Sequence, residues 1–345
     1  MFERALSESG RRITVVGATS GDTGSAAIHA LAGRRNIAVV ILHPHGRVSE
    51  VQRRQMTTVT APNVLNVAVR GTFDDCQRLV KQLFADARLR EELGLAAVNS
   101  INWARIAAQS VYYAFAAVRL GGLARPVLFS VPTGNFGDVY AGHVARRMGL
   151  PLRGLVVATN ENDILARFLE TGRYEPAGVR PTITPAMDIQ VASNFERLLF
   201  ELFDGDGAAV AAAFRELAER GGFSVPAFVL ARARALFRAG RADQEETRRT
   251  IAAVHREAGV VIDPHTAVAV AVGRRLRGAG EGPLVHLATA HPAKFPDTVR
   301  EVLGIRPALP PAWRDLFERE ERCMVLDPDP AAIAAAVREH AERAP

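Results

Sequence analysis

Residues 13–32 read ITVVGATSGDTGSAAIHALA. This segment begins with a short β-branched apolar run, passes through a turn rich in glycine and hydroxyl residues, and ends in an alanine-rich stretch typical of a helix. A strand that is apolar at nearly every position is expected where a sheet is covered on both faces. Strand, tight turn and helix form the first half of a βαβ unit, so the segment predicts an α/β protein built on parallel sheet.

The same arrangement recurs along the chain, and helical stretches separate most of the apolar runs. The predicted strands are Ile13–Val16, Ile37–Leu42, Val64–Val69, Val127–Val131, Leu155–Ala158 and Leu284–Ala288. The predicted helices are Thr23–Ala32, Thr72–Leu93, Asn102–Arg119, Gly137–Met148, Asn194–Phe203, Ala208–Arg220, Val225–Ala239, Asp243–Ala258, His265–Leu276 and a terminal one around 331–336. A Gly-Gly turn and a proline within 121–126 indicate a domain boundary, which predicts a smaller lobe over 1–120 and a larger lobe over 121–345.

Length and composition indicate a globular protein with two lobes or one large α/β body. The chain has 345 residues, of which 48% are hydrophobic and 23% charged, and it has no run of about 20 apolar residues that could span a membrane. Residues 1–12 lack the apolar core of a secretory signal, so we expect a cytoplasmic location and no membrane partner. The net charge of +6 comes from arginines scattered among acidic residues, which argues against a nucleic-acid partner. Cys76 and Cys323 lie too far apart to indicate a metal knuckle or a redox pair.

The first candidate site is the turn GATSGDTG at 17–24. Backbone N–H groups at the start of the following helix, together with the hydroxyls of Thr19, Ser20 and Thr23, suit a carboxylate or a phosphate. The alternative is a plain helix cap, in which Asp22 or Ser20 satisfies those donors itself. The pattern alone leaves both interpretations open.

The second candidate site is the stretch FSVPTGNFGD at 129–138, again a strand, a turn and a helix. Gly134 and Gly137 allow the backbone to approach an oxyanion closely, and the helix adds the positive end of its dipole. The stretch lacks the lysine of a P-loop and the third glycine of a dinucleotide fingerprint. It therefore predicts a cradle for a different phosphorylated ligand.

The third candidate site is the stretch NSINWAR at 99–105. Asn102 and Arg105 are three residues apart near the start of a predicted helix, so they share a helix face that suits a phosphate ester. A helix cap by Ser100 or Asn102, with Arg105 exposed, is the alternative.

The fourth candidate site, LATAHPAKFP at 287–296, follows a predicted strand, and ligands of open α/β sheets gather at such carboxyl ends. Lys294 lies between two prolines, where a solvated lysine is as well accounted for as a Schiff-base lysine. His291, His265 and Asp263 imitate part of a metal site, but they lack close HxH or HxxxH spacing. We therefore expect no metal.

Taken in order, these motifs closely resemble the threonine synthases of the bacterial and fungal type. These are pyridoxal-phosphate enzymes with the tryptophan synthase beta fold, also called fold-type II. The resemblance extends from Gly17 to about Leu303, nearly the whole chain. It is carried by ATSGDTG at 18–24, NSIN at 99–102, VPTGNFGD at 131–138, ATN at 158–160 with Asn162 and Asp163, PAMDI at 185–189, DPH at 263–265 and TAHPAKF at 289–295.

The resemblance implies two lobes, each with a mostly parallel sheet flanked by helices, and a carbon–oxygen lyase that uses pyridoxal 5′-phosphate. The implied reaction converts O-phospho-L-homoserine and water to L-threonine and phosphate by β,γ-replacement. By this resemblance the cofactor phosphate is wrapped by the loop Gly134, Asn135, Phe136, Gly137 and Asp138, while Thr289 faces the pyridine nitrogen. The substrate carboxylate falls to the turn Thr19, Ser20, Gly21, Asp22 and Thr23, and the substrate phosphate to Asn102 and Arg105.

One departure from the family concerns lysine. The family's cofactor-linking lysine lies in a Phe-Lys-Asp motif upstream of the SGDTG turn, and the only two lysines here, Lys81 and Lys294, do not match it. We therefore expect the C-terminal portion of a threonine synthase, inactive by itself, with apolar surface exposed on the strands that begin at Ile13 and Ile37. The alternatives are a noncatalytic module that binds pyridoxal phosphate or a phosphometabolite, and a gene fragment without function.

Overall fold

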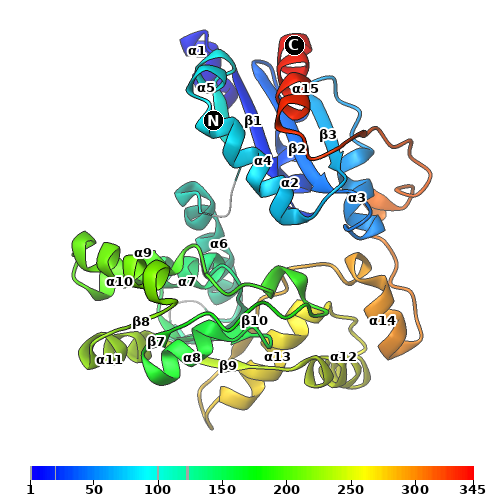
Figure 1. Cartoon of the computed structure of the whole chain (residues 1–345). Helices are drawn as coiled ribbons and strands as arrows, with labels where there is room; N and C mark the ends of the chain where they lie inside the picture. The colour runs from blue at the N-terminus through cyan, green and yellow to red at the C-terminus, as the bar shows by residue number, and fades with distance from the viewer. Residues whose placement is uncertain (1, 20, 99–100, 122–123) are drawn as a thin grey trace. The chain divides into compact units, whose positions relative to one another are not determined.

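The computed structural model describes the whole chain except residues 1, 20, 99–100 and 122–123. The chain divides into two compact units, which are drawn in Figure 1. The small unit consists of Met1–Asn99 together with Leu309–Pro345, and the large unit is Ser100–Ala308. Each unit contains a parallel sheet flanked by helices, which confirms the predicted α/β architecture.

The small unit is built on a five-stranded parallel sheet with strand order β11-β3-β2-β1-β4. Ile13 pairs with Ile37 at the start of β1 and β2, so the two predicted strands lie side by side. The strands are β1 (Ile13–Ala18), β2 (Ile37–Pro44), β3 (Val64–Val69), β4 (Leu95–Ala97) and β11 (Met324–Leu326). The helices are α1 (Phe2–Ser9), α2 (Asp22–Leu31), α3 (Glu50–Thr57), α4 (Phe73–Ala85), α5 (Ala87–Glu92) and α15 (Pro330–Arg343), with the short η4 (Pro311–Trp313).

Side-chain alternation along β2 divides the core of the small unit into two layers. Val40 and Leu42 pack in a cluster with residues of α4 and α15, whereas Val39 and Ile41 pack with residues of α2 and α3. Every residue of β2 is buried, and so are the four inner positions of β1. The predicted exposure of apolar surface on these two strands is therefore wrong, because helices cover both faces of the sheet.

Two segments differ from the predicted lobes. Residues 309–345 belong to the small unit, because β11 extends its sheet by pairing with β3 and α15 packs against α4. Helix α6 (Trp103–Arg119) belongs to the large unit, where Tyr113 packs on Phe129 of the sheet. A strand of three residues carries too little pattern to be predicted from sequence, and a Gly-Gly turn marks the end of a helix without showing which core the helix joins.

The large unit is built on a parallel sheet with strand order β10-β5-β6-β9. Its strands are β5 (Val127–Pro132), β6 (Leu152–Thr159), β9 (Phe237–Arg241) and β10 (Leu284–His286), with a small antiparallel pair of β7 (Arg173–Tyr174) and β8 (Phe223–Ser224). Its helices, besides α6, are α7 (Gly137–Arg147), α8 (Ile164–Thr171), α9 (Phe195–Leu202), α10 (Gly207–Arg220), α11 (Ala227–Leu236), α12 (Gln244–Ala258), α13 (Pro264–Leu276) and α14 (Pro296–Leu303), with the short η2 (Pro185–Met187) and η3 (Pro292–Lys294).

The core of the large unit also lies on both faces of its sheet. Phe129 belongs to a cluster with residues of α7, α8 and α9, while its neighbour Leu128 packs with residues of α13 on the other face. Helix α13 is buried from Pro264 to Gly273, and its side chains there are mostly alanine and valine. Small side chains allow this helix to lie close to the strands, which fixes the carboxyl ends of β5 and β6.

Two predicted helices divide at points that the hydrophobic pattern does not mark. The predicted helix Val225–Ala239 is α11 followed at once by strand β9, and no glycine or proline stands between them. The predicted helix Thr72–Leu93 is α4 and α5, separated by Asp86, whose side chain accepts the N–H groups of Arg88 and Leu89 and caps the second helix.

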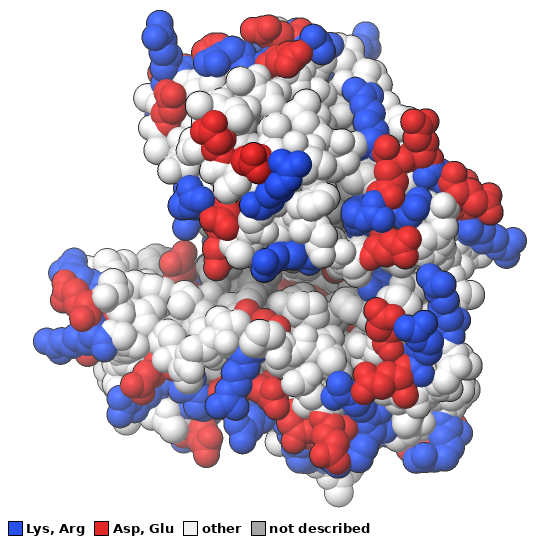
Figure 2. Space-filling model, turned by 45° about the vertical axis from the view of Figure 1, so that its right-hand side comes forward, with Lys and Arg blue, Asp and Glu red and all other residues white. Residues whose placement is uncertain are grey.

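Acidic and basic side chains are interspersed on the face of the molecule shown in Figure 2. Elsewhere in the chain, exposed ion pairs such as Arg248–Glu301 and Arg274–Glu257 each have an N–O distance of 2.9 Å. Such exposed pairs contribute about 0–1 kcal/mol each. Within the described residues, each helix is either too short or too polar to cross a lipid bilayer.

Candidate active site

The site begins at the carboxyl end of β5, where residues 133–136 form a turn into α7. The side-chain oxygen of Asn135 accepts the N–H of Gly137 at 2.8 Å, which closes the turn. Phe136 has the left-handed φ of 67°, a conformation that costs a non-glycine residue about 1–2 kcal/mol. Its ring is buried against Phe195 and Phe237, and this burial offsets the cost. Phe136 therefore contributes its backbone to the turn and its side chain to the core.

Close packing surrounds both glycines of this turn. A Cβ atom added to Gly134 would lie 2.6 Å from the carbonyl oxygen of Ala186 and 3.1 Å from Cα of Met187, both in η2. A Cβ on Gly137 would lie 2.9 Å from the side-chain oxygen of Asn135 and 3.2 Å from the side-chain nitrogen of Asn194. Backbone contact therefore requires glycine at 134, whereas at 137 the neighbouring side chains leave little room; we call the turn at 134–138 the cradle. The remaining N–H groups of the first turn of α7 and the helix dipole suit an anion such as a phosphate.

Asp138, in the first turn of α7, is held by a tyrosine from α6. The hydroxyl of Tyr113 donates to the backbone oxygen of Asp138 at 2.7 Å and lies 3.2 Å from its carboxylate. Burial raises the pKa of Asp138 to about 6, although its bond with Tyr113 and the charge of Arg105 act in the opposite direction. Burial also raises the pKa of Tyr113 far above its ordinary value. The partly protonated carboxyl group lessens the repulsion of an anion in the cradle near pH 6.

The predicted residue Thr289 lies at the same edge of the sheet as the cradle. Strand β10 pairs with β5, with His286 opposite Ser130, and the N–H of Leu287 donates to the oxygen of Ser130 at 3.0 Å. Thr289 follows two residues later and is exposed. Because parallel strands end at one edge, the structure brings Thr289 to the edge from which the Gly134–Asp138 turn also begins.

A buried Asp–His pair supports η2, the segment that lies against Gly134. Asp263 caps α13, and its carboxylate lies 3.0 Å from Nδ1 of His265. The N–H of Ala186 donates to Nε2 of His265 at 3.4 Å, so the proton of the imidazole lies on Nδ1. These two residues therefore fix the floor of the cradle.

His291, which the sequence grouped with His265 and Asp263 as part of a possible metal site, caps a short helix instead. Nδ1 of His291 accepts the N–H of Ala293 and caps η3. No group of three His, Cys, Asp or Glu side chains in the described part of the chain could hold a metal ion.

A network of polar side chains fixes the segment before η2. The amide of Asn160, at the end of β6, donates to the hydroxyls of Thr182 and Thr184 at 2.9 Å each and to the carboxylate of Asp188 at 2.8 Å. Asn162 donates to the same carboxylate at 3.0 Å. Asn160 of the ATN motif and the nearby Asn162 thus have a structural use, because they hold the segment that carries η2.

Asn102 and Arg105 lie in the same unit as the cradle. The side-chain oxygen of Asn102 accepts the N–H of Ala104 at 2.9 Å, so Asn102 is the N-cap of α6, as one of the alternatives proposed. Both residues are exposed, and the charge of Arg105 acts on Asp138. The structure therefore brings together two of the sites predicted from sequence, although the sequence had placed them in different lobes.

The turn at 17–24 lies in the small unit, and it is closed by Thr19, which the first interpretation had assigned to an anion and the second had not chosen as a cap. The hydroxyl of Thr19 accepts the N–H groups of Gly21 at 2.9 Å and Gly24 at 3.0 Å. The carboxylate of Asp22 accepts the side-chain amide of Gln52 at 3.1 Å. Ser20 lies outside the described residues. Two of the donors expected for an anion are thus already bonded, and the role of this turn in substrate binding stays a prediction.

The two lysines differ in setting. Lys81 is exposed on α4 of the small unit, which agrees with the predicted surface position. Lys294 is half-buried in η3 of the large unit, and the adjacent ring of Phe295 lies 4.8 Å from that of His265.

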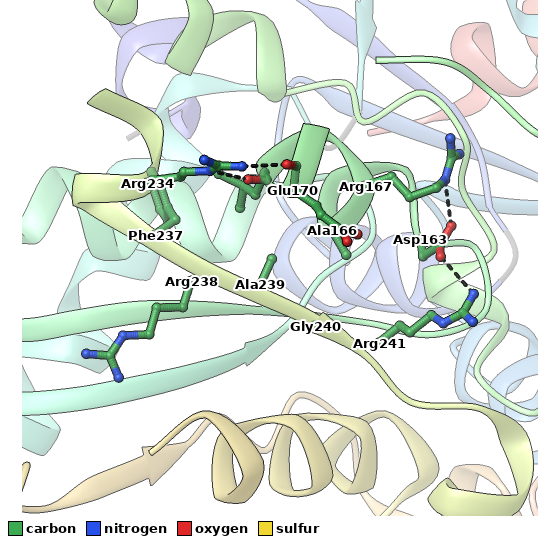
Figure 3. Close-up of a pocket in the computed structure, with 11 residues that line it drawn as sticks. Asp163, Ala166, Arg167, Glu170, Arg234, Phe237, Arg238, Ala239, Gly240 and Arg241 are labelled. Carbon is green, nitrogen blue, oxygen red and sulfur yellow. Dashed lines mark hydrogen bonds and ion pairs between the residues drawn. The ribbon is translucent and has the colours of Figure 1, made fainter. Parts of the chain in front are cut away.

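A separate pocket of about 710 Å³ lies beside the edge strand β9. Figure 3 shows Arg167 and Arg241 directed at Asp163, at 2.9 and 3.0 Å, and Arg234 directed at carbonyls of α8. These arginines are bonded to protein groups, and none of the predicted site residues lines the pocket. The pocket is therefore distinct from the cradle.

Sequence reasoning missed three residues that join parts of the site. They are Tyr113, Asn194 and Arg197. Asn194 and Arg197 lie in the first turn of the predicted helix Asn194–Phe203, and the sequence suggested for Asn194 only that it caps this helix.

The parallel α/β units and the glycine cradle at a strand end are those of a pyridoxal-phosphate enzyme of fold-type II, and the family match and a solved pyridoxal-phosphate-bound relative establish this class. Residues 1–243 match the family model described as pyridoxal-phosphate dependent enzyme, and residues 266–337 match the one described as threonine synthase, C-terminal. The chain belongs to the threonine synthase family.

Individual relatives agree with this assignment. The chain is 50% identical to the threonine synthase of Pseudomonas aeruginosa, over 99% of this chain and 73% of that protein. It is 44% identical to the threonine synthase of Corynebacterium glutamicum, over 96% of this chain and 71% of that protein. Among solved structures, pyridoxal-phosphate-bound threonine synthase from Brucella melitensis has a TM-score of 0.96 and 50% identity, over 99% of this chain and 73% of that one. The yeast enzyme has a TM-score of 0.92 and 41% identity, over 98% and 73%.

Proposed function

We propose that this polypeptide binds pyridoxal phosphate and O-phospho-L-homoserine as a threonine synthase, and that the 345 residues by themselves give no turnover. The observation that carries the first part is the Gly134–Asp138 cradle, in a chain 50% identical to a threonine synthase. The reaction is the conversion of O-phospho-L-homoserine and water to L-threonine and phosphate. The cytoplasmic location expected from the sequence stays a prediction.

The residues of the cradle fit a phosphate monoester. Gly134 and Gly137 let the backbone approach the phosphate oxygens, Asn135 holds the turn, and the first turn of α7 supplies N–H donors and a positive helix end. We assign the hydroxyl of Thr289, which is exposed at the same edge of the sheet, to the ring nitrogen of the cofactor. When bound, pyridoxal phosphate supplies a conjugated ring that accepts electrons from the substrate carbon.

The substrate has two anionic ends, and the chain offers two further groups of polar residues. We assign the carboxylate to the turn at Thr19, Gly21, Asp22 and Thr23, together with Ser20, and the phosphate to Asn102 and Arg105. Arg105 and the N-cap position of α6 suit a dianionic phosphate by charge and by helix dipole.

The lysine content supports the proposal that the 345 residues by themselves give no turnover. By resemblance to the family, a lysine must link to the cofactor and move protons between substrate carbons, and Lys81 and Lys294 match neither the motif nor its place in the sequence. General acid–base assistance alone is worth about 10²- to 10⁴-fold, so turnover should fall to near background. The same observation favours a second candidate function, a noncatalytic module that binds pyridoxal phosphate.

The experiment is to purify the chain beside the threonine synthase of P. aeruginosa as the active control. We expect reversible binding of pyridoxal phosphate and binding of O-phospho-L-homoserine, with no phosphate release above background. A chain that binds the cofactor but not the substrate supports the noncatalytic module. Phosphate release, with Lys81 or Lys294 covalently labelled after borohydride treatment, contradicts the predicted inactivity. A folded chain that binds neither ligand contradicts the proposed function.

A further inference from the structure

Arg197 of α9 contacts the start of α6 directly and reaches the cradle indirectly, through Asn194. Its guanidinium donates to the backbone oxygen of Ile101 at 2.6 Å and, through Nε, to the side-chain oxygen of Asn194 at 3.3 Å. Ile101 immediately precedes Asn102, the N-cap of α6. One side chain therefore reaches the start of the helix that carries Asn102 and Arg105.

The other end of this connection is the cofactor cradle. Both the backbone N–H and the side-chain amide of Asn194 donate to the backbone oxygen of Asn135, at 3.0 and 3.2 Å. The same amide would lie 3.2 Å from a Cβ atom on Gly137. Asn194 is buried, so these bonds are shielded from water and hold their geometry well.

An aromatic contact fixes the orientation of the guanidinium. Its central carbon lies 5.7 Å from the centre of the Trp103 ring, and Trp103 is the first residue of α6. A planar guanidinium can stack on a ring while its edge donates to two acceptors, whereas a lysine ammonium cannot keep all three contacts in one geometry. Arg197 therefore connects the cradle to α6 through contacts that depend on its shape.

We propose that Arg197 is a positioning residue that couples cofactor binding at the cradle to substrate binding at the start of α6. This inference rests on the proposed function, which assigns one phosphate to each segment. An anion in the cradle fixes Asn135, then Asn194 and Arg197, and thereby the backbone at Ile101. The second phosphate then meets a segment that is already ordered, so it binds more tightly.

Charge favours the same coupling. Two phosphates held in one unit repel each other, and Arg197 supplies a cation that contacts the start of α6 and the Asn194 side chain bonded to the cradle. Loss of the guanidinium removes both the connection and this compensation. The coupling is reciprocal, so each ligand should strengthen the binding of the other by the same factor.

The test measures the dissociation constant of O-phospho-L-homoserine by calorimetry, with and without saturating pyridoxine 5′-phosphate. This probe carries the cofactor's phosphate but has no aldehyde, so it cannot react with the amino group of the substrate. The variants are Arg197→Ala and Arg197→Lys. The matched control is Arg232→Ala, because Arg232 also stacks on a ring, that of Phe228 at 5.5 Å, and pairs with Asp204 away from the site.

In the parent chain we expect the probe to tighten substrate binding by about 5-fold or more, in the range usual for coupled sites. The tightening should fall below 2-fold in Arg197→Ala and to an intermediate value in Arg197→Lys, while Arg232→Ala keeps the parental value. Circular dichroism of each variant checks its fold. A parent that binds the two ligands independently, or an Arg197→Ala variant that keeps the parental tightening, overturns the coupling alone. A parent that binds neither ligand contradicts the proposed function and the coupling with it.

Discussion

Gly134→Ala is the substitution that tests the cradle most sharply. The new Cβ atom would lie 2.6 Å from the oxygen of Ala186, whereas ordinary contact begins at 3.4 Å, so η2 or the turn must move by about 0.8 Å (3.4 minus 2.6). The opposing atoms of Ala186 and Met187 belong to the backbone. Two hydrogen bonds hold this backbone in place: the N–H of Met187 donates to the oxygen of Thr184, and the N–H of Ala186 donates to Nε2 of His265. Overpacking of this kind costs about 1–3 kcal/mol of folding free energy.

The same displacement should weaken cofactor binding, because phosphate recognition by backbone N–H groups depends on their positions. A misplacement near 1 Å can cost a factor of about 10² in function, and we expect at least a 10-fold loss of affinity for pyridoxal phosphate. Urea unfolding measures the stability, and fluorescence titration measures the affinity.

Gly207→Ala is the matched control for this substitution. Gly207 is the first residue of α10, and a Cβ atom there meets only the ring of Phe200 at 3.9 Å. This variant should be neutral or more stable by up to about 1 kcal/mol. A Gly134→Ala variant with the stability and the affinity of the parent would refute the reasoning.

Three further predictions concern other positions of the chain. Because the folded-state pKa of Asp138 is raised to about 6 from an ordinary 3.8, its carboxyl group destabilises the fold progressively as pH rises from about 4 through 6. Asp138→Asn should therefore add up to about 3 kcal/mol to the free energy of unfolding at pH 8 and little at pH 4. Urea unfolding curves that give the same stability difference between variant and parent at both pH values would contradict this. Gly24→Ala should lower the free energy of unfolding by about 1–3 kcal/mol, because its Cβ atom would lie only 2.9 Å from side-chain atoms of Ile41 and Met56. Thermal or urea unfolding measures this, and an unchanged stability would show that these side chains move aside without cost. Asn135→Ala and Gly137→Val should both weaken binding of pyridoxal phosphate, the valine more strongly, and calorimetry with parental affinity in both variants would remove the loop from the cofactor site.

The sequence predicted the architecture because its strands are dense in β-branched residues and lie between helices with clear ends. Val64–Val69 was predicted with the bounds that the structure has, and the start of the predicted helix at Gly137 coincides with that of α7. The turn from β5 into α7 was also predicted, because closely spaced glycines follow a buried strand there, whereas its role as a phosphate cradle stays a prediction.

Other features have no local signal. Strand β9 follows α11 without a break, and its identity depends on pairing with β6, which lies about 80 residues away in sequence. The bond between Tyr113 and Asp138 joins two helices whose crossing is fixed by packing. The hydroxyl of Thr19 was expected to face an anion, yet the fold uses it to close its own turn. Such contacts are set by tertiary structure, so they cannot be read from a single segment.

Binding of the cofactor phosphate by the Gly134–Asp138 cradle can be observed residue by residue. Amide NMR of the ¹⁵N-labelled, deuterated chain during titration with pyridoxal phosphate does this, because each N–H group reports its own environment. We predict that the first and largest shifts fall on Gly134, Gly137 and Asp138. Largest shifts among residues of the arginine pocket beside β9, such as Gly240 and Arg241, with the cradle signals unmoved, would contradict the account.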